Sequence, residues 1–167
     1  TVDDIQEHVR GFVDAPVIFA QRLRAVYPDL HVWPRVMFAQ TDTMPPASIA
    51  APASVRRLGP LDREVLTGLS SDLAWIHKTW GGAAGLAESG SGWGAFVDGC
   101  LVSVACSFFV GFSYEDIGVI TEPTHQGRGL STACAAGLIG DIQARGRRAS
   151  WTTSPDNDAS LRVAHKL

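Results

Sequence analysis

The sequence predicts a mixed α and β domain, on the strength of three observations. The apolar run at 117–121 has the composition of a β-strand and ends just before a proline. A glycine-bearing turn at 126–130 follows it and opens a helix of small and apolar residues. Two more strand-like runs, 93–97 and 100–109, flank Asp98-Gly99, which is a strong signal for a β-hairpin.

Residues 1–42 are expected to form a helical N-terminal extension. Apolar residues recur at helical spacing over 1–12, and a second helix is expected to begin near Pro16 and to end before Tyr27-Pro28. A strand is expected over 31–39, with its proline marking a sheet edge or the entry to the strand.

The stretch 43–52 is rich in Pro and Ala and has no periodicity, which predicts a linker. The main domain is therefore expected over 53–167. Its first strand is expected at 55–58, and a helical region over 61–87 is expected to break at Gly81-Gly82.

The helix after the glycine turn carries one apolar face. Leu130, Cys134, Leu138 and Ile142 recur at four-residue steps. Gly137 and the neighbouring alanines are small enough to let this helix lie close against a sheet.

Composition fits a soluble globular domain with a substantial core. Hydrophobic residues make up 46% of the 167 residues and charged residues 19%, with five Trp and seven Phe. The net charge is −3 and Lys and Arg form no dense run, which argues against nucleic acid or a membrane as partner. Arg145, Arg147 and Arg148 do cluster, either as cations at a helix C-terminus or as a ribose-phosphate contact.

The three cysteines, Cys100, Cys106 and Cys134, are odd in number and have no Cys-x-x-Cys spacing. They fit reduced thiols packed as small hydrophobes, and we expect no bound metal. No apolar run approaches 18 residues, and the first residues lack a charged-then-apolar signal pattern. A cytoplasmic location is expected.

The strand, glycine turn and helix around residues 117–144 predict an anion-binding site. Free backbone N–H groups and the positive end of the helix dipole point at one place, and a phosphate or pyrophosphate is the obvious ligand. A P-loop string is absent from the sequence. A dinucleotide fingerprint also fits poorly, because Thr132 stands where its third glycine belongs.

The turn resembles the coenzyme A pyrophosphate loop of the GNAT superfamily of N-acetyltransferases, whose pattern is Gln/Arg-x-x-Gly-x-Gly/Ala. Here it reads Gln126-Gly127-Arg128-Gly129-Leu130-Ser131, with Ser131 in place of Gly or Ala. The resemblance continues downstream, where Asn157-x-x-Ser160 is similar to the family's Asn-x-x-Ala/Ser motif. The two motifs occur in the family's order and at its spacing. The resemblance is specific over 114–167 and covers none of 1–40.

The resemblance implies a GNAT fold and an acetyl-CoA site. The fold is a mostly antiparallel, twisted sheet with helices on both faces and a splayed parallel strand pair. The backbone amides of Gln126 through Ser131 would hold the pyrophosphate, with help from the Arg128 side chain. The main chain of Val119, Ile120 and Thr121 would hold the pantetheine arm and the thioester. Asn157 would bind the pantetheine or a water molecule.

The resemblance leaves the catalytic groups less defined. Many family members protonate the leaving thiolate with a Tyr seven residues after the motif asparagine, and that position is Ala164 here. Ser160 is the expected substitute, as the similarity to the Asn-x-x-Ser branch of the family implies, and it shares a helix face with Asn157. Glu122 is the first choice for the base, and the other candidates are Glu115, Asp116, His125 and His165.

The expected reaction is acetyl transfer from acetyl-CoA to a primary amine of a small molecule or a protein N-terminus, by direct attack. One alternative is a catalytically weak or inactive acyl-CoA sensor, and another is a plain interaction domain. A homodimer is one option for assembly. The family usually continues with two further strands where this chain stops, at Leu167. We expect these strands to lie outside the given sequence, to come from another chain, or to be replaced by the N-terminal segment.

Overall fold

The computed structural model describes residues 16–40 and 53–167, which belong to two compact units. The chain divides between Pro34 and Arg35. The described part of the first unit contains the helix α2 (Pro16–Val26), whose bounds agree with the sequence prediction. The helix expected over 1–12 and the linker expected over 43–52 fall on residues outside the described ranges. Within those ranges, no helix is long and apolar enough to cross a membrane.

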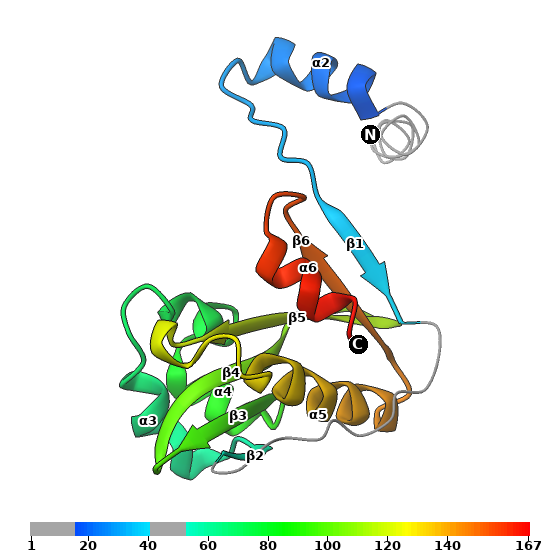
Figure 1. Ribbon diagram of the computed structural model, residues 1–167. Coiled ribbons are helices and arrows are strands. Elements are labelled where there is room, and N and C mark those ends of the chain that lie inside the picture. The colour runs from blue at the N-terminus through cyan, green and yellow to red at the C-terminus, as the bar shows by residue number, and fades with distance from the viewer. Residues whose placement is uncertain (1–15, 41–52) are drawn as a thin grey trace. The chain divides into compact units, whose positions relative to one another are not determined.

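The second unit is built on one six-stranded sheet with the order β1-β6-β5-β4-β3-β2 (Figure 1). Its strands are β1 (Val36–Ala39), β2 (Ser54–Arg57), β3 (Gly92–Val97), β4 (Cys100–Val110), β5 (Tyr114–Thr121) and β6 (Arg148–Thr153). Every neighbouring pair is antiparallel except β5 and β6, which run parallel. The expected sheet, mostly antiparallel with one parallel pair, is confirmed.

The hairpin between β3 and β4 forms at the predicted dipeptide. Asp98 has φ 49° and Gly99 has φ 80°, so both central residues adopt positive φ. A two-residue loop of this kind matches the twist of the flanking strands, and Asp-Gly is among the sequences that tolerate it best. The strand bounds lie within one residue of those expected from the sequence.

The strand expected over 31–39 is shorter in the structure and belongs to the sheet. It begins after Pro34 as β1 and pairs with β6, with Val36 opposite Thr153 and Ala39 opposite Ser150. Proline has no N–H to donate to a strand ladder, which is consistent with pairing that begins beyond it. The compact second unit starts at Arg35.

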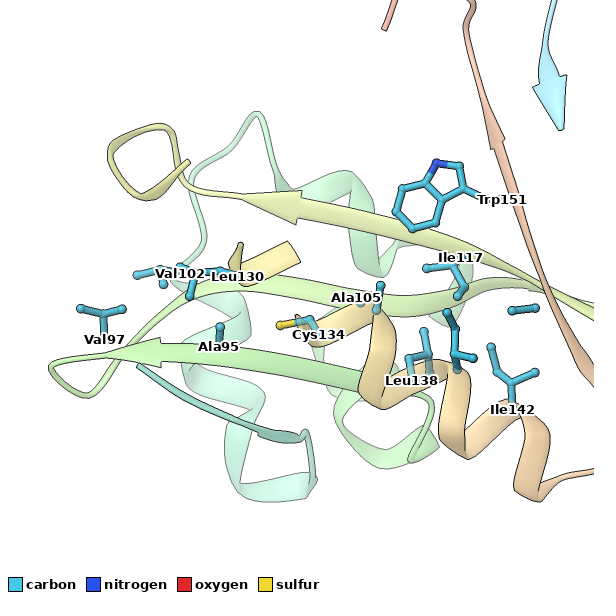
Figure 2. Packing of buried hydrophobic residues seen from close by; sticks show 13 residues of the cluster. Ala95, Val97, Val102, Ala105, Ile117, Leu130, Cys134, Leu138, Ile142 and Trp151 are labelled. Atoms are coloured by element: carbon cyan, nitrogen blue, oxygen red, sulfur yellow. The ribbon is translucent and has the colours of Figure 1, made fainter. Parts of the chain in front are cut away.

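One face of the sheet is covered by the helix α5 (Leu130–Ala144), as Figure 1 shows. The four residues of its predicted apolar face are all at most 3% exposed. They pack with side chains of β3, β4, β5 and β6, among them Ile117 and Trp151 (Figure 2). The predicted apolar face of this helix is confirmed.

The opposite face is covered by short helical segments. These are the 3-10 turn Pro60–Asp62, α3 (Arg63–Thr67), the 3-10 helix Ala74–Trp80 and α4 (Ala83–Ser89). Leu66, Ile76 and Leu86 are fully buried against Val104 and Ile120 of the sheet. The break expected at Gly81-Gly82 is present, since both glycines adopt positive φ before α4 begins.

The α5 helix lies close to the sheet at Gly137, which has no side chain. A Cβ on Gly137 would lie 2.5 Å from the ring of Trp93 in β3. That ring has little freedom to move, because its Nε1 donates to Asp141 Oδ2 over 2.7 Å. Arg57 of β2 donates to the same carboxylate, with 2.8 Å between its Nε and Asp141 Oδ2.

We expect Gly137→Ala to lower the free energy of unfolding by about 1–3 kcal/mol, because the added methyl group overpacks the contact with Trp93. The matched control is Gly140→Ala in the same helix, where nothing lies within 4 Å of the new Cβ. That substitution should raise the free energy of unfolding by about 0.5–1 kcal/mol, because alanine loses less backbone entropy than glycine. Urea unfolding followed by circular dichroism measures both changes, and equal effects would contradict the close-contact account.

Candidate active site

The parallel strands β5 and β6 diverge after only three register pairs. Tyr114 pairs with Arg148, Glu115 with Ala149 and Asp116 with Ser150. Beyond these pairs β5 continues to Thr121 and β6 to Thr153, and Figure 1 shows the two strands diverging. Among the described residues, the second half of β5 therefore has no strand partner on its β6 side. We call the space between these two strand halves the inter-strand gap.

The ladder between β4 and β5 decides which peptide groups face the gap. The N–H of Glu122 donates to the carbonyl of Val102, 2.8 Å away. Bonding direction alternates along an antiparallel strand, so Ile120 directs its N–H and C=O toward β4. In agreement, Ser103 Oγ donates to the Ile120 carbonyl over 2.7 Å. The N–H and C=O of Val119 and Thr121 consequently point into the inter-strand gap.

This alternation separates the three residues predicted to hold the pantetheine arm. Val119 and Thr121 offer main-chain groups to the gap, whereas Ile120 uses its own on β4. The Ile120 side chain is 5% exposed and belongs to the core on the face opposite α5. Sequence alone could not make this distinction, because it depends on which residue of β4 lies opposite each residue of β5.

The glycine loop begins where β5 ends. After the 3-10 turn Pro123–His125, Gly127 and Gly129 adopt φ values of 74° and 78°, which favour glycine. A Cβ on either glycine would meet nothing within 4 Å, so the loop faces open space. Gln126 Nε2 donates to the carbonyl of Thr121 over 3.3 Å, which ties the loop to the strand end. The side chain of Arg128 is exposed, and its Nη2 lies 3.5 Å from the carbonyl of Thr124.

The backbone amides of this loop are available to a ligand. Among the described residues, none of the N–H groups from Gly127 to Ser131 donates to a protein acceptor. They lead into the first turn of α5, a helix of 15 residues whose positive dipole end lies at Leu130. Unpaired donors at a helix N-terminus form an anion-binding site. The residues predicted to hold a pyrophosphate therefore carry N–H groups that can bind an anion.

Asn157 and Ser160 are brought together at the start of α6 (Asp158–Ala164). Asn157 is the N-cap residue, and its Oδ1 accepts the backbone N–H of Ser160 over 3.0 Å. Ser160 Oγ accepts from Nε1 of Trp151 in β6, 2.9 Å away. Both residues thus have structural contacts in addition to their predicted roles.

Two acidic candidates flank the gap. Glu122 follows β5, and its Oε1 accepts the backbone N–H of Ser70 over 3.1 Å. This contact joins the end of β5 to the helical region on the opposite side of the sheet from α5. Asp116 lies at the last register pair, where its Oδ1 accepts from the hydroxyl groups of Ser150 and Thr152, each at 3.0 Å. Sequence reasoning named Asp116 as a base candidate and missed this contact between the strands.

Glu115 is buried in an ion-pair network and is unsuited to act as a base. It is 1% exposed and accepts from Ser107 Oγ, Arg145 and Arg147, with 2.6 Å between Arg145 Nη2 and its Oε2. Burial alone would raise the pKa of Glu115, but the hydrogen bonds from Arg145, Ser107 and Arg147 outweigh it and lower the pKa to about 2. Arg145 and Arg147 therefore hold a carboxylate, which neither sequence interpretation of this cluster anticipated.

The remaining candidates take other positions. His125 Nδ1 lies 3.0 Å from Thr124 Oγ1, and the ring of His165 packs edge-on against Phe38.

Burial raises the pKa of the Cys106 and Cys134 thiols to about 12, as expected for thiols packed in a core. Cys100 is exposed, which corrects the expectation that all three cysteines are packed. The part of the chain that the structure describes contains no cluster of three or more His, Cys, Asp or Glu suited to a metal.

The arrangement of these groups defines a class of protein. A strand edge that faces a gap and leads to N–H groups at a helix N-terminus is the layout that the resemblance implies for an acyl-CoA site. The model of a family described as GNAT acetyltransferase matches residues 49–167, and the chain belongs to this family. The family uses acetyl-CoA as its acyl donor.

Relatives support the same assignment. The chain is 38% identical over 134 residues to the "uncharacterized N-acetyltransferase in mutA 5′ region" of Streptomyces virginiae. This match covers 80% of the chain but only 56% of the relative, so the chain spans little more than half the length of that protein.

Solved structures share the fold. A GCN5-related N-acetyltransferase-like protein from Streptococcus suis has a TM-score of 0.60 at 21% identity, covering 89% of this chain and 62% of that one. An acetyltransferase of the GNAT family from Colwellia psychrerythraea also has a TM-score of 0.60, at 16% identity, covering 78% and 50% of the two chains. At these identities the likeness concerns the fold alone.

The network around Glu115 should make stability depend on pH. Because folding lowers the pKa of Glu115 from 4.5 to about 2, the ionised carboxylate stabilises the fold fully above pH 4.5. This contribution is lost as the pH falls through about 2. We expect Glu115→Gln to lower the free energy of unfolding by about 1.5–3 kcal/mol near neutral pH, because it removes the buried carboxylate that accepts hydrogen bonds from the half-buried side chains of Arg145 and Arg147.

The same substitution should flatten the decline in stability between pH 4.5 and about 2. Chemical unfolding at a series of pH values measures both effects. Glu64→Gln, at an exposed glutamate of α3, serves as the control and should leave the pH profile unchanged. An unchanged profile for Glu115→Gln would contradict the role assigned to the network.

Proposed function

We propose that this chain binds acetyl-CoA and transfers its acetyl group to a primary amine of a small molecule or of a protein N-terminus. The observation that carries the proposal is the set of N–H groups from Gly127 to Ser131, which donate to no acceptor among the described residues and follow shortly after the edge of β5 that faces the inter-strand gap. A ligand with a pyrophosphate at one end and an amide-bearing arm at the other matches these two features in order. Family membership supports the same function.

The binding roles follow from the chemistry of each group. The loop amides and the dipole of α5 would hold the pyrophosphate, and the exposed Arg128 side chain could reach a phosphate as well. The main-chain groups of Val119 and Thr121 would bond to the amides of the pantetheine arm. Asn157 would bind that arm through the part of its side chain that does not cap α6.

Direct transfer requires one new bond and two proton movements. The amine nitrogen attacks the carbonyl carbon of the thioester, and the carbon–sulfur bond breaks. A base takes the proton from the attacking nitrogen, and an acid gives one to the sulfur. The chain must therefore supply or orient a proton acceptor and a proton donor.

Ser160 suits the role of the acid. Its Oγ accepts a hydrogen bond from Trp151 Nε1, which leaves its own proton free to be donated elsewhere. Glu122 is our choice for the base, acting directly or through water. The N–H of Ser70 fixes one of its oxygens at the end of β5. Asp116 remains the alternative base, and its Oδ1 accepts from the hydroxyl groups of Ser150 and Thr152.

A second candidate function is a sensor that binds acyl-CoA without turnover. Position 164, where the resemblance places a tyrosine acid in many family members, is an alanine that packs against the core of the α5 face. This observation favours weak catalysis and leaves the binding argument intact.

Titration with CoA and release of free thiol from acetyl-CoA, measured with a panel of primary amines, separate the candidates. Binding with amine-dependent thiol release supports the transferase. Binding without release supports the sensor. Failure to bind CoA at millimolar concentration would overturn both functions and favour a plain interaction domain.

Gly127→Ala should weaken CoA binding by about tenfold or more. A side chain at φ 74° is strained by roughly 1–2 kcal/mol, and the new methyl group enters the space in front of the loop amides. Gly146→Ala is the matched control, because Gly146 has φ 73° but lies beyond the far end of α5. Calorimetry should show unchanged CoA affinity for that variant, and equal losses for both would contradict the assigned loop.

Ser160→Ala should lower kcat by about 10²- to 10⁴-fold with little change in the Kd for CoA, because it removes the proposed acid. Trp151→Phe is the control for packing, since it removes the hydrogen bond to Ser160 but keeps the hydroxyl. That variant should keep kcat within a few-fold of the original. Steady-state kinetics with saturating amine measures both, and an unchanged kcat for Ser160→Ala would exclude Ser160 as the acid.

A further inference from the structure

We propose that Asp116 is a positioning residue, which sets the separation of β5 and β6 at the entrance of the inter-strand gap and so prepares the gap for the pantetheine arm. The inference rests on the proposed function, because it concerns the same ligand. It assigns Asp116 a role that differs from that of a base. The role depends on hydrogen bonds to Asp116 and needs no proton transfer.

The contacts of Asp116 span the point where the strands part. Its Oδ1 accepts from Ser150, its own register partner, and from Thr152, the next residue on the same side of β6. Thr152 lies beyond the last register pair. One carboxylate oxygen therefore contacts both the last paired residue of β6 and the second residue past the pairing, each over 3.0 Å.

The main chain of Thr152 faces the gap. The N–H of Gln40 donates to the carbonyl of Ala149, so odd-numbered residues of β6 direct their peptide groups toward β1. The N–H of Arg148 donates to the carbonyl of Ser113, so even-numbered residues direct theirs toward β5. Holding the hydroxyl of Thr152 thus also places its peptide groups on the β6 side of the gap, where the register of the strand pair aligns them with those of Ile117 and Val119.

A β-bulge in β4 lies beside the same part of β5. The register of β4 against β5 shifts between Ser107 and Phe109, which lie opposite Ile117 and Asp116. An extra residue in one strand increases the local twist and bends that strand. The bulge turns the sheet where β5 leaves β6, while Asp116 keeps a hydrogen-bonded connection across the parting strands.

Contacts other than those of Asp116 hold the paired end of β5 and β6. Glu115, one residue earlier, is fixed from the other side by Arg145 and Arg147. Loss of the Asp116 contacts should therefore leave the paired end intact and change only the gap. This separation makes a specific effect on the pantetheine part of the ligand measurable.

The test compares two ligands on the full chain. CoA carries the pantetheine arm, and 3′-phosphoadenosine 5′-diphosphate carries the pyrophosphate without it. The variants are Asp116→Ala, Thr152→Val, which removes only the hydroxyl donor, and Asp116→Asn, whose amide oxygen still accepts hydrogen bonds. Thr67→Val is the control, because it removes a hydroxyl that bonds within α3 instead. Circular dichroism establishes that each variant is folded.

We expect Asp116→Ala and Thr152→Val to weaken CoA binding by about tenfold, which corresponds to one net hydrogen bond, with unchanged affinity for the diphosphate. Asp116→Asn and Thr67→Val should both retain CoA affinity within about threefold. Retained CoA affinity in Asp116→Asn would indicate that Asp116 acts by accepting hydrogen bonds.

Four results would overturn the inference. Unchanged CoA affinity in Asp116→Ala and Thr152→Val, or equal losses for both ligands, would remove the special connection to the pantetheine arm. Loss of turnover in Asp116→Asn with unchanged CoA affinity would make Asp116 a base. If the unsubstituted chain binds neither ligand, the proposed function itself fails and this inference fails with it.

Discussion

The parting of β5 and β6 is the constraint on which the rest of the site depends. Buried or half-buried peptide groups need hydrogen-bond partners, and a sheet normally supplies them from the next strand. Here the pairing stops at Asp116 and Ser150, so the peptide groups of Val119 and Thr121 face a gap. The glycine loop begins at the end of the same strand. The peptide groups that face the gap at Val119 and Thr121 are thus followed, a few residues later, by the N–H groups at the start of α5, which donate to no acceptor among the described residues.

The packing of the sheet does not depend on pairing between β5 and β6 along the gap. Two separate apolar clusters pack the sheet, one under α5 and one under the short helices of the opposite face. The ion pairs of Glu115 hold the paired end of β5 and β6 from the α5 side. Removing one partner of such a network destabilises the fold, because the remaining charges lose their partner. The strands can therefore diverge over a short length without loosening the core.

Features that depend on neighbouring residues could be predicted well. The turn at Asp98-Gly99, the apolar face of α5 and the glycine loop all follow from periodicity or from backbone preference over a few positions. The roles of Glu115 and Arg145 could not be predicted, because these residues lie 30 positions apart and meet only when α5 packs beside β5. The same holds for Ile120, whose peptide direction depends on its register with β4.

The amino-acid sequence by itself determined the local chemistry of this protein: which segments form strands or helices, and which loop leaves its amides free. These properties depend on backbone sterics and on side-chain spacing within one element. Tertiary structure decided which carboxylate is neutralised by arginines, which peptide groups face the gap and how Asp116 connects two strands. Those outcomes depend on strand register and helix packing, which bring together residues that are distant in the chain.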